Sequence, residues 1–195
     1  ILKSDFPSEW KDINDLLKRF KLKKSWIVTP GGRKSQVSES IDSFLLKRGW
    51  VEKEFETKIT VDDKSTDTPT HKVDCFKNKV ALEIEWNNKD PFFDRDLENF
   101  KRLHAEGAIS VGILITRGAS LQQQMRAMVR RFADERGVNG FDDLATNGYV
   151  PTPKQKAAIQ RRFTRAANPP LFADAWTDNF VGNKYGQATT HWDKL

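Results

Sequence analysis

The pattern of apolar and polar residues between residues 72 and 88 predicts a β-hairpin. A two-residue turn at Asn78-Lys79 would place Asp74 directly across from Glu83, with their Cβ atoms about 4.5–5.5 Å apart. The period of two puts Glu85 on the same face of the hairpin. The opposite face is apolar, so a register slip of one residue would move its side chains out of the core. These apolar residues are Val73, Cys75, Val80, Leu82 and Ile84.

Three carboxylates on one face of a hairpin indicate a metal site. Like charges opposite each other destabilise a sheet, and a divalent cation removes that conflict. Asp74, Glu83 and the backbone carbonyl of Ile84 would give Mg²⁺ an all-oxygen site with room for water, and Mn²⁺ is expected to substitute. Glu85 would bind the metal or act as the base on a metal-bound water. The alternative is a surface hairpin whose acidic face is only solvated.

Helical periodicity predicts amphipathic helices before and after the hairpin. The apolar stripe of the first helix includes Trp10 and Leu17, and that of the helix after the hairpin includes Leu97. The predicted helices span residues 8–22, 35–48, 94–106, 120–135 and 154–167.

Two further segments predict strands. Residues 50–61 alternate and would form a strand beside the hairpin, ending in a turn at residues 62–65. Residues 109–116 are almost all apolar, which is typical of a strand covered on both faces. A crossover through the helix at 94–106 would make this strand a parallel neighbour of residues 80–86. Residues 140–153 are predicted as loop, and the fold class is mixed α/β.

The length and composition predict one globular domain over residues 1–195. With 37% hydrophobic and 31% charged residues, the chain has no apolar run near the roughly 18 residues of a membrane span. A single cysteine and the lack of a visible signal peptide favour a cytoplasmic location without a membrane partner. Cys75 itself is expected in the core.

The formal net charge is +6 although the predicted site is acidic, so the positive charge is concentrated elsewhere. Basic residues cluster within 18–24, 126–136 and 154–165. This separation is typical of a protein that attracts a polyanion to an acidic metal site. Arg117, at the end of a predicted central strand, is expected to approach DNA. The alternative is a basic protein whose charged helix faces are only solvated.

Other chemistries lack their sequence patterns. His71, His104 and His191 are far apart, and the chain has neither H-E-x-x-H nor a Cys/His spacing suited to zinc. No G-x-S-x-G or G-x-G-x-x-G motif follows a predicted strand. Neither a hydrolase triad nor a dinucleotide site is therefore indicated.

Four stretches carry a family pattern: Pro69-Thr-His-Lys-Val-Asp74, residues 83–100 beginning Glu83-Ile-Glu-Trp-Asn-Asn, Ile115-Thr-Arg-Gly118, and residues 184–194. Together they resemble the BglII/BstYI family of type II restriction endonucleases. The resemblance covers most of the chain. It is weakest over residues 138–175, which we interpret as an insertion or accessory helical segment.

The resemblance implies a restriction-endonuclease-like fold, α/β with a mixed central β-sheet flanked by helices. It also implies a homodimer that uses Mg²⁺ to hydrolyse phosphodiester bonds of double-stranded DNA at a palindromic site, leaving 5′-phosphates. A cognate DNA methyltransferase would be present in the cell. Asp74, Glu83 and Glu85 would be the catalytic residues. Glu85 stands where this superfamily commonly has Lys and BglII has Gln, although BamHI-type enzymes have Glu, so the number of metals and the identity of the base stay open.

The resemblance also implies DNA contacts. Asn87 and Asn88 follow the catalytic strand, and Asn pairs bidentately with adenine, although an Asn-Asn turn is the alternative. Glu39, on a helix before the hairpin, would support a metal-bound water, with a solvated glutamate as the alternative. Residues 178–195 would form a DNA-contacting C-terminal segment. The remaining residues expected to contact DNA are Lys89, Lys184, Tyr185, Thr189, Thr190 and His191.

Two other functions fit the same pattern. One is a structure- or damage-specific DNA nuclease of the same fold. The other is a catalytically silent DNA-binding protein in which the carboxylates are structural. Cutting of plasmid DNA in the presence of Mg²⁺ distinguishes the three functions.

Overall fold

The computed structural model describes residues 1–29, 34–68, 72–86, 92–164 and 167–185. These residues form two compact units. The first contains the described residues of 1–21, 36–86 and 91–116, and the second contains those of 22–35 and 117–195. The three predicted catalytic carboxylates all belong to the first unit. The single domain over residues 1–195 stays a prediction.

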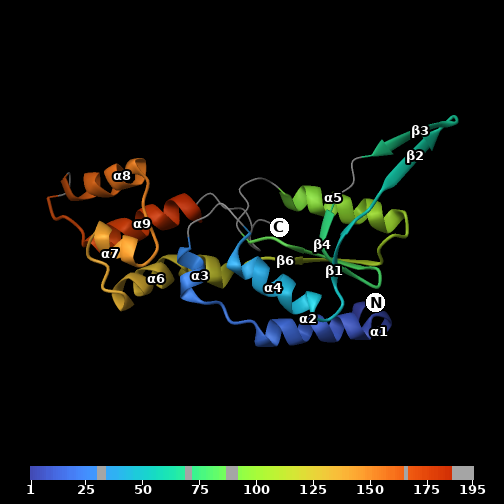
Figure 1. The fold of residues 1–195 in the computed structure, drawn as a ribbon, viewed down its shortest axis with the longest axis horizontal. Coiled ribbons are helices and arrows are strands. Elements are labelled where there is room, and N and C mark those ends of the chain that lie inside the picture. Colours follow the sequence, from blue (N-terminus) through green and yellow to red (C-terminus); the bar gives the residue numbers. More distant parts are fainter. Residues whose placement is uncertain (30–33, 69–71, 87–91, 165–166, 186–195) are drawn as a thin grey trace. The chain divides into compact units, whose positions relative to one another are not determined.

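A mixed four-stranded sheet is the centre of the first unit (Figure 1). Its strands lie in the order β1 (Val51–Glu54), β4 (Lys72–Lys77), β5 (Val80–Ile84) and β6 (Val111–Ile115). β4 is antiparallel to both β1 and β5, whereas β5 and β6 are parallel. The predicted α/β class and the parallel crossover to β6 are therefore confirmed. Because β6 is the edge strand, its residues are only partly buried, not covered on both faces as predicted.

The β4–β5 hairpin has the predicted register. Cys75 pairs with Leu82 and Lys77 pairs with Val80, so the next step along the ladder sets Asp74 opposite Glu83. The turn residues Asn78 and Lys79 have φ angles of 52° and 66°. Two consecutive residues with positive φ form the type of tight turn that matches the twist of the strands it joins.

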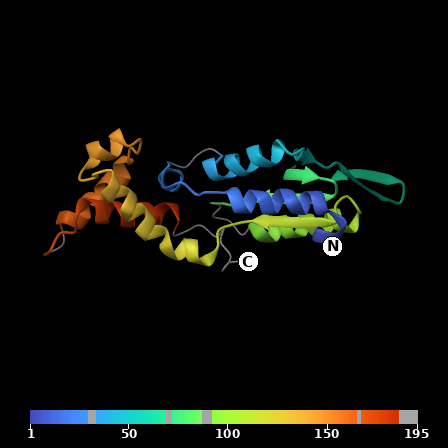
Figure 2. The ribbon, with the colours of Figure 1, turned by 90° about the horizontal axis from the view of Figure 1, so that it is seen from below.

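The two faces of this sheet are covered by different helices. On the face of Cys75, the Sγ atom lies 3.4 Å from Asp42 Oδ1 on α4 (Gln36–Leu46), and Lys77 Nζ lies 2.8 Å from Asp12 Oδ2 on α2 (Pro7–Arg19). Figure 2, seen from below, has α2 and α4 in front of the sheet. A short helix, α1 (Leu2–Asp5), precedes α2.

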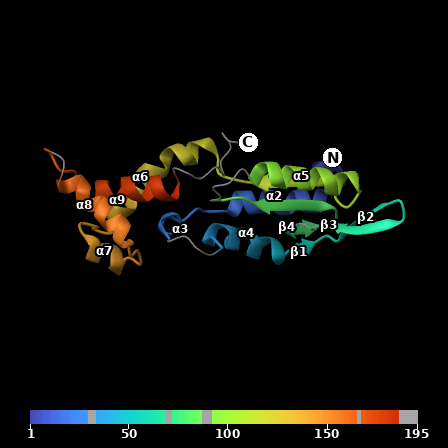
Figure 3. The same cartoon turned by 90° about the horizontal axis from the view of Figure 1, so that it is seen from above.

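Helix α5 (Phe92–Ala105) covers the opposite face of the sheet and is seen from above in Figure 3. A Cβ atom added at Gly112 on β6 would lie only 2.5 Å from Cδ2 of Phe100 on α5. Gly112 pairs with Ala81 of β5, and Ala81 shares its face with Glu83. The helix therefore approaches the sheet closely on the face that carries the acidic residues.

The buried stripes of α2 and α5 differ from the predicted ones. Trp10, Leu17 and Leu97 are exposed, although the sequence predicted that they face the core. Charged residues take their place: Asp12 is buried in α2 because it accepts hydrogen bonds from Trp50 Nε1 at 3.0 Å and from Lys77. Because Asp12 is buried together with its hydrogen-bond partners, the face of α2 that packs against the core differs from the apolar stripe of the helix.

The strand predicted over residues 50–61 is divided in two. After β1, the segment β2 (Thr57–Val61) pairs with β3 (Lys64–Thr68) to form a separate antiparallel hairpin (Figure 1). The predicted turn between them is confirmed by positive φ angles of 48° at Asp62 and 65° at Asp63. β3 was not predicted, because it has no clear apolar alternation.

The second unit is helical in its described residues, with α3 (Lys24–Val28), α6 (Ala119–Glu135), α7 (Phe141–Thr146), α8 (Pro153–Thr164) and α9 (Phe172–Lys184). Its core packs around the fully buried Trp176 of α9. The loop predicted over residues 140–153 is wrong, because α7 lies within it and buries Leu144 in this core. None of the helices in the described residues combines the length and apolar character needed to cross a membrane.

Candidate active site

Asp74 and Glu83 lie across the β4–β5 hairpin and contact each other's strands. The backbone N–H of Ile84 donates a 3.0 Å hydrogen bond to Asp74 Oδ2. The backbone N–H of Asp74 lies 3.4 Å from Glu83 Oε2. Beyond the strand, the N–H of Glu85 continues the parallel pairing by donating to the carbonyl of Ile115 at 2.9 Å. The structure therefore brings the predicted acidic residues together on the face covered by α5.

The acidic face is enclosed rather than solvated. Glu83 is 4% exposed and Glu85 is 7% exposed, whereas Asp74 is half-buried. Their burial follows from the position of α5 on this face. The alternative of a surface hairpin with a solvated acidic face is therefore wrong.

Burial and mutual repulsion raise the pKa of two of these carboxyl groups. The pKa of Glu83 rises to about 9, first because of burial and then because of the charges of Asp74 and Asp96. The pKa of Glu85 rises to about 8 because of burial, followed by a hydrogen bond with the side chain of Asp96. Without a cation, the site therefore favours protonated forms of Glu83 and Glu85 at neutral pH.

The sequence reasoning missed two residues of this site, Arg95 and Asp96 in the first turns of α5. Asp96 is fully buried, and its Oδ1 atom accepts hydrogen bonds from Nε and Nη2 of Arg95, both at 3.2 Å. Arg95 Nη2 also lies 3.9 Å from Glu85 Oε1. The sequence did carry a signal for the burial of Asp96, because Asp96 has helical spacing from Phe93 and Phe100, which are buried.

The donor set fits a hard divalent cation. Carboxylates and a carbonyl are the ligands that Mg²⁺ prefers, and a cation would relieve the repulsion that raises the pKa of Glu83. In the described part of the chain, no three or more His, Cys, Asp or Glu side chains gather where they could hold one metal ion. The predicted set needs two carboxylates, from Asp74 and Glu83, together with the carbonyl of Ile84. It therefore stays a prediction.

Three residues expected to contact DNA lie within the second unit. Arg117 is 1% exposed, and its guanidinium carbon lies 5.2 Å from the ring centroid of Tyr185. The Tyr185 hydroxyl donates to the carbonyl of Ile27 at 2.5 Å, and Lys184 Nζ donates to the carbonyls of Ile27, at 2.8 Å, and Thr29. Lys184 and Tyr185 therefore fasten the end of α9 to α3.

Burial also affects the charges of this group. The pKa of Lys184 falls to about 8 through burial and then through the positive charge of Arg117. The pKa of Arg117 falls to about 10, again mainly through burial. Arg117 is therefore still a cation at neutral pH, and Lys184 is only partly deprotonated.

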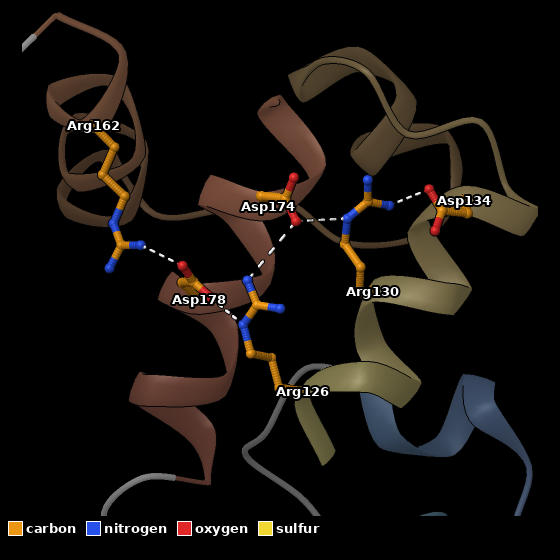
Figure 4. A network of polar contacts seen from close by, with 6 residues as sticks. All are labelled: Arg126, Arg130, Asp134, Arg162, Asp174 and Asp178. Carbon is orange, nitrogen blue, oxygen red and sulfur yellow. Dashed lines mark hydrogen bonds and ion pairs between the residues drawn. The ribbon is translucent and has the colours of Figure 1, made fainter. Parts of the chain in front are cut away.

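Several arginines of the predicted basic clusters are neutralised by α9 (Figure 4). Asp178 accepts hydrogen bonds from Arg126 Nε at 2.6 Å and from Arg162 Nη1 at 2.8 Å. Asp174 accepts one from Arg130 Nε at 2.8 Å. The sequence clusters at 126–136 and 154–165 therefore overstate the positive charge that these helices offer to a polyanion.

The other predicted site residues have separate outcomes. Glu39 is exposed on α4, opposite the buried Val37 and Ile41, as predicted, and its role near a metal stays a prediction. Six residues expected to contact DNA lie outside the described residues: Asn87, Asn88, Lys89, Thr189, Thr190 and His191.

Comparison with known protein families gives a match over the full length of the sequence. A family model described as restriction endonuclease BglII/BglIII matches residues 1–195, the whole chain. None of the curated proteins compared matches the chain. The family match includes residues 138–175, where the motif resemblance was weakest.

Proposed function

The chain belongs to the restriction endonuclease BglII/BglIII family, and we propose that it is a type II enzyme that hydrolyses double-stranded DNA with Mg²⁺. The proposed target is a palindromic site, cut by a homodimer to leave 5′-phosphates. A cognate methyltransferase in the same cytoplasm would protect the cell's own DNA. Family membership supports the class of enzyme.

One observation supports the metal dependence. The hairpin and α5 together bury Glu83 and Glu85 beside Asp74 and Asp96, at a free-energy cost that appears as raised pKa values for Glu83 and Glu85. A protein that needed only a stable hairpin gains nothing from this arrangement, since apolar residues would pack there without repulsion. Such arrangements are characteristic of sites that bind a cation or perform acid–base chemistry.

The proposed roles follow from the position of each group. Asp74, Glu83 and the carbonyl of Ile84 would hold Mg²⁺. When bound, Mg²⁺ would stabilise the negative charge that develops on the phosphate and lower the pKa of the attacking water. Glu85, the next acid on the same face, would bind the metal or accept the proton of that water. Glu39 is a proposed support for the water.

The proposed DNA contacts come from two segments of the chain and from Arg117. Asn87, Asn88 and Lys89 directly follow the carboxylates and would contact the bases and backbone near the cut. Lys184 and Tyr185 would anchor the start of a C-terminal segment that holds the DNA. The residues of that segment are Thr189, Thr190 and His191. Arg117 is a further proposed contribution to phosphate attraction.

Incubation of supercoiled plasmid DNA with the protein tests the proposal. Discrete fragments are expected with Mg²⁺ or Mn²⁺ and none with a chelator, and sequencing of the fragment ends would give the site and the 5′-phosphates. Nicks or smears would instead indicate a structure- or damage-specific nuclease. Binding without cutting would indicate a catalytically silent protein.

A pair of variants assigns the reaction to the predicted site. Glu83→Gln is expected to slow cutting by about a thousandfold or more, because it removes a metal ligand worth several kcal/mol in the transition state. DNA binding in Ca²⁺ should be retained. Glu98→Gln is the matched control, since Glu98 is an exposed glutamate on the outer side of α5. Equal cutting by wild type and Glu83→Gln would contradict the assignment.

A further inference from the structure

Arg95 is held in a fixed position at the start of α5. Its Nε and Nη2 atoms both donate to Asp96 Oδ1 at 3.2 Å. Asp96 is fully buried, so the carboxylate that holds the guanidinium has little freedom to move. Hydrogen bonds at two of its nitrogens fix the orientation of the planar guanidinium, which also carries a positive charge.

The same guanidinium faces both the acidic site and the solvent. Arg95 Nη2 lies 3.9 Å from Glu85 Oε1, yet the Arg95 side chain is 61% exposed while that of Glu85 is 8% exposed. Within the described residues, Arg95 Nη1 has no hydrogen-bond partner in the protein. Of the five N–H groups of an arginine, those on Nη1 are therefore free to bind a ligand that arrives from solvent.

A nuclease with this site has to overcome electrostatic repulsion. The phosphate must approach a cluster of acidic residues, and a single divalent cation cannot neutralise all of Asp74, Glu83, Glu85 and Asp96 if each is charged. A positive group beside the cluster would reduce the repulsion. Arg95 is a cation of the described structure that contacts this cluster while staying accessible.

We propose that Arg95 is a catalytic residue that binds the phosphate undergoing cleavage, with Asp96 as its positioning residue. This inference rests on the proposed function. The N–H groups on Arg95 Nη1 would donate to the phosphate oxygens, and the positive charge of the guanidinium would stabilise the extra negative charge that those oxygens carry in the transition state. The bond that breaks is the ester bond to the leaving 3′-oxygen. The oxygen of the attacking water forms the new bond to phosphorus and gives up its proton to the base, whereas the leaving 3′-oxygen keeps the bonding electron pair and takes a proton from water.

Single-turnover cleavage with enzyme in excess is the first test. Arg95→Ala is expected to slow cleavage by about 10²–10³-fold, the usual effect of removing one donor to a developing oxyanion. Arg95→Lys should recover only part of the rate, because lysine keeps the positive charge but lacks the planar guanidinium that Asp96 orients. Lys101→Ala is the matched control: Lys101 is an exposed cation on the same helix, paired at 3.3 Å with Glu98, and its loss should change the rate less than about twofold.

A counter-ion role for Arg95 would give different results. If Arg95 only neutralised Glu85 and Asp96, Arg95→Ala would alter thermal stability and Ca²⁺ affinity without DNA, and its rate would return at higher Mg²⁺ concentration. We expect the rate defect to persist at saturating Mg²⁺ and the metal affinity to change little. Recovery of the wild-type rate at high Mg²⁺ would overturn the inference.

A binding measurement tests whether Arg95 contacts the phosphate at the cut position. Once the cut position is known from fragment ends, Ca²⁺-supported binding is compared for a normal duplex and one with a neutral methylphosphonate at that position. Arg95→Ala should weaken binding to the normal duplex about tenfold and leave binding to the methylphosphonate duplex unchanged. An equal loss on both duplexes would overturn the inference. Failure of the wild type to cut DNA would instead overturn the proposed function.

Discussion

The backbone N–H of Asp74 lies 3.4 Å from Glu83 Oε2, so the two residues are linked directly across the hairpin. The N–H of Ile84 completes the link by donating to Asp74 Oδ2 at 3.0 Å. The pairing that sets the strand register thus also sets the spacing of the carboxylates. A change in one is expected to disturb the other.

The metal-free protein should lose stability as the pH rises. The pKa of Glu83 is raised from 4.5 to about 9, so between these pH values the folded protein keeps a proton that the unfolded chain has lost. The stabilisation is complete below pH 4.5 and disappears as the pH passes through about 9. Thermal unfolding in chelator should show the midpoint falling by about 5 °C or more over this range.

Glu83→Gln provides the comparison for that measurement. The amide cannot ionise, so the variant should have a flatter dependence of unfolding temperature on pH and a higher midpoint than the wild type at pH 9. Wild-type and variant curves of the same slope would contradict the raised pKa of Glu83.

Metal binding should strengthen over the same pH range. Mg²⁺ must displace the proton from Glu83, whose pKa is about 9, so a proton competes with the metal at neutral pH. Calorimetric titration with Mg²⁺ or Ca²⁺ is therefore expected to give affinity that rises about tenfold per pH unit between pH 6 and 8, with proton release. Affinity that is independent of pH, or the same in Glu83→Gln, would argue against Glu83 as a ligand.

Gly112→Ala should destabilise the first unit. The new Cβ atom would meet the Phe100 ring at 2.5 Å, and overpacking of this kind costs about 1–3 kcal/mol. Urea unfolding measures the loss, which Phe100→Leu should partly reverse in the double variant. Gly182→Ala is the control, because among the described residues no atom outside the neighbouring helix backbone lies within 4 Å of its added Cβ, and alanine favours the α9 helix. Equal stability of Gly112→Ala and wild type would contradict the close approach of α5.

Asp178→Asn tests the arginine network of the second unit. It removes the ion pairs with Arg126 and Arg162 and should lower the free energy of unfolding by about 1 kcal/mol at low salt, since the pairs are partly exposed. The loss should shrink in 1 M NaCl because salt screens such pairs. Glu106→Gln, an exposed acid on the surface, should show neither effect. A loss of the same size at high salt would indicate packing rather than charge.

The hairpin was predictable because its register depends only on residues that are close together in the sequence. Alternation fixes which residues share a face, and Asn78-Lys79 accepts the positive φ angles that the turn requires. The parallel neighbour at Ile109–Thr116 followed from general rules for crossovers. These two inferences together placed Asp74, Glu83 and Glu85.

The residues that were missed depend on tertiary contacts. Asp96 looks like a solvent-exposed helix residue in the sequence, and its burial follows only when α5 is laid across the acidic face. Likewise, Trp10 and Leu17 appear to be core residues until Asp12 is found paired with Lys77 and Trp50. Leu144 sits in a short helix whose few residues give no periodic signal, and its burial depends on packing against Trp176 and its neighbours.

The contact between Lys77 and Asp12 has a consequence for ligand binding. Lys77 lies three residues from Asp74 on the same strand and also donates to the carbonyl of Arg48 at 2.9 Å, so β4 is clamped to the helices behind it. These contacts of Lys77 restrict how far β4 can move when a ligand binds. The carboxylates are therefore preorganised, and little conformational entropy remains to be lost on binding.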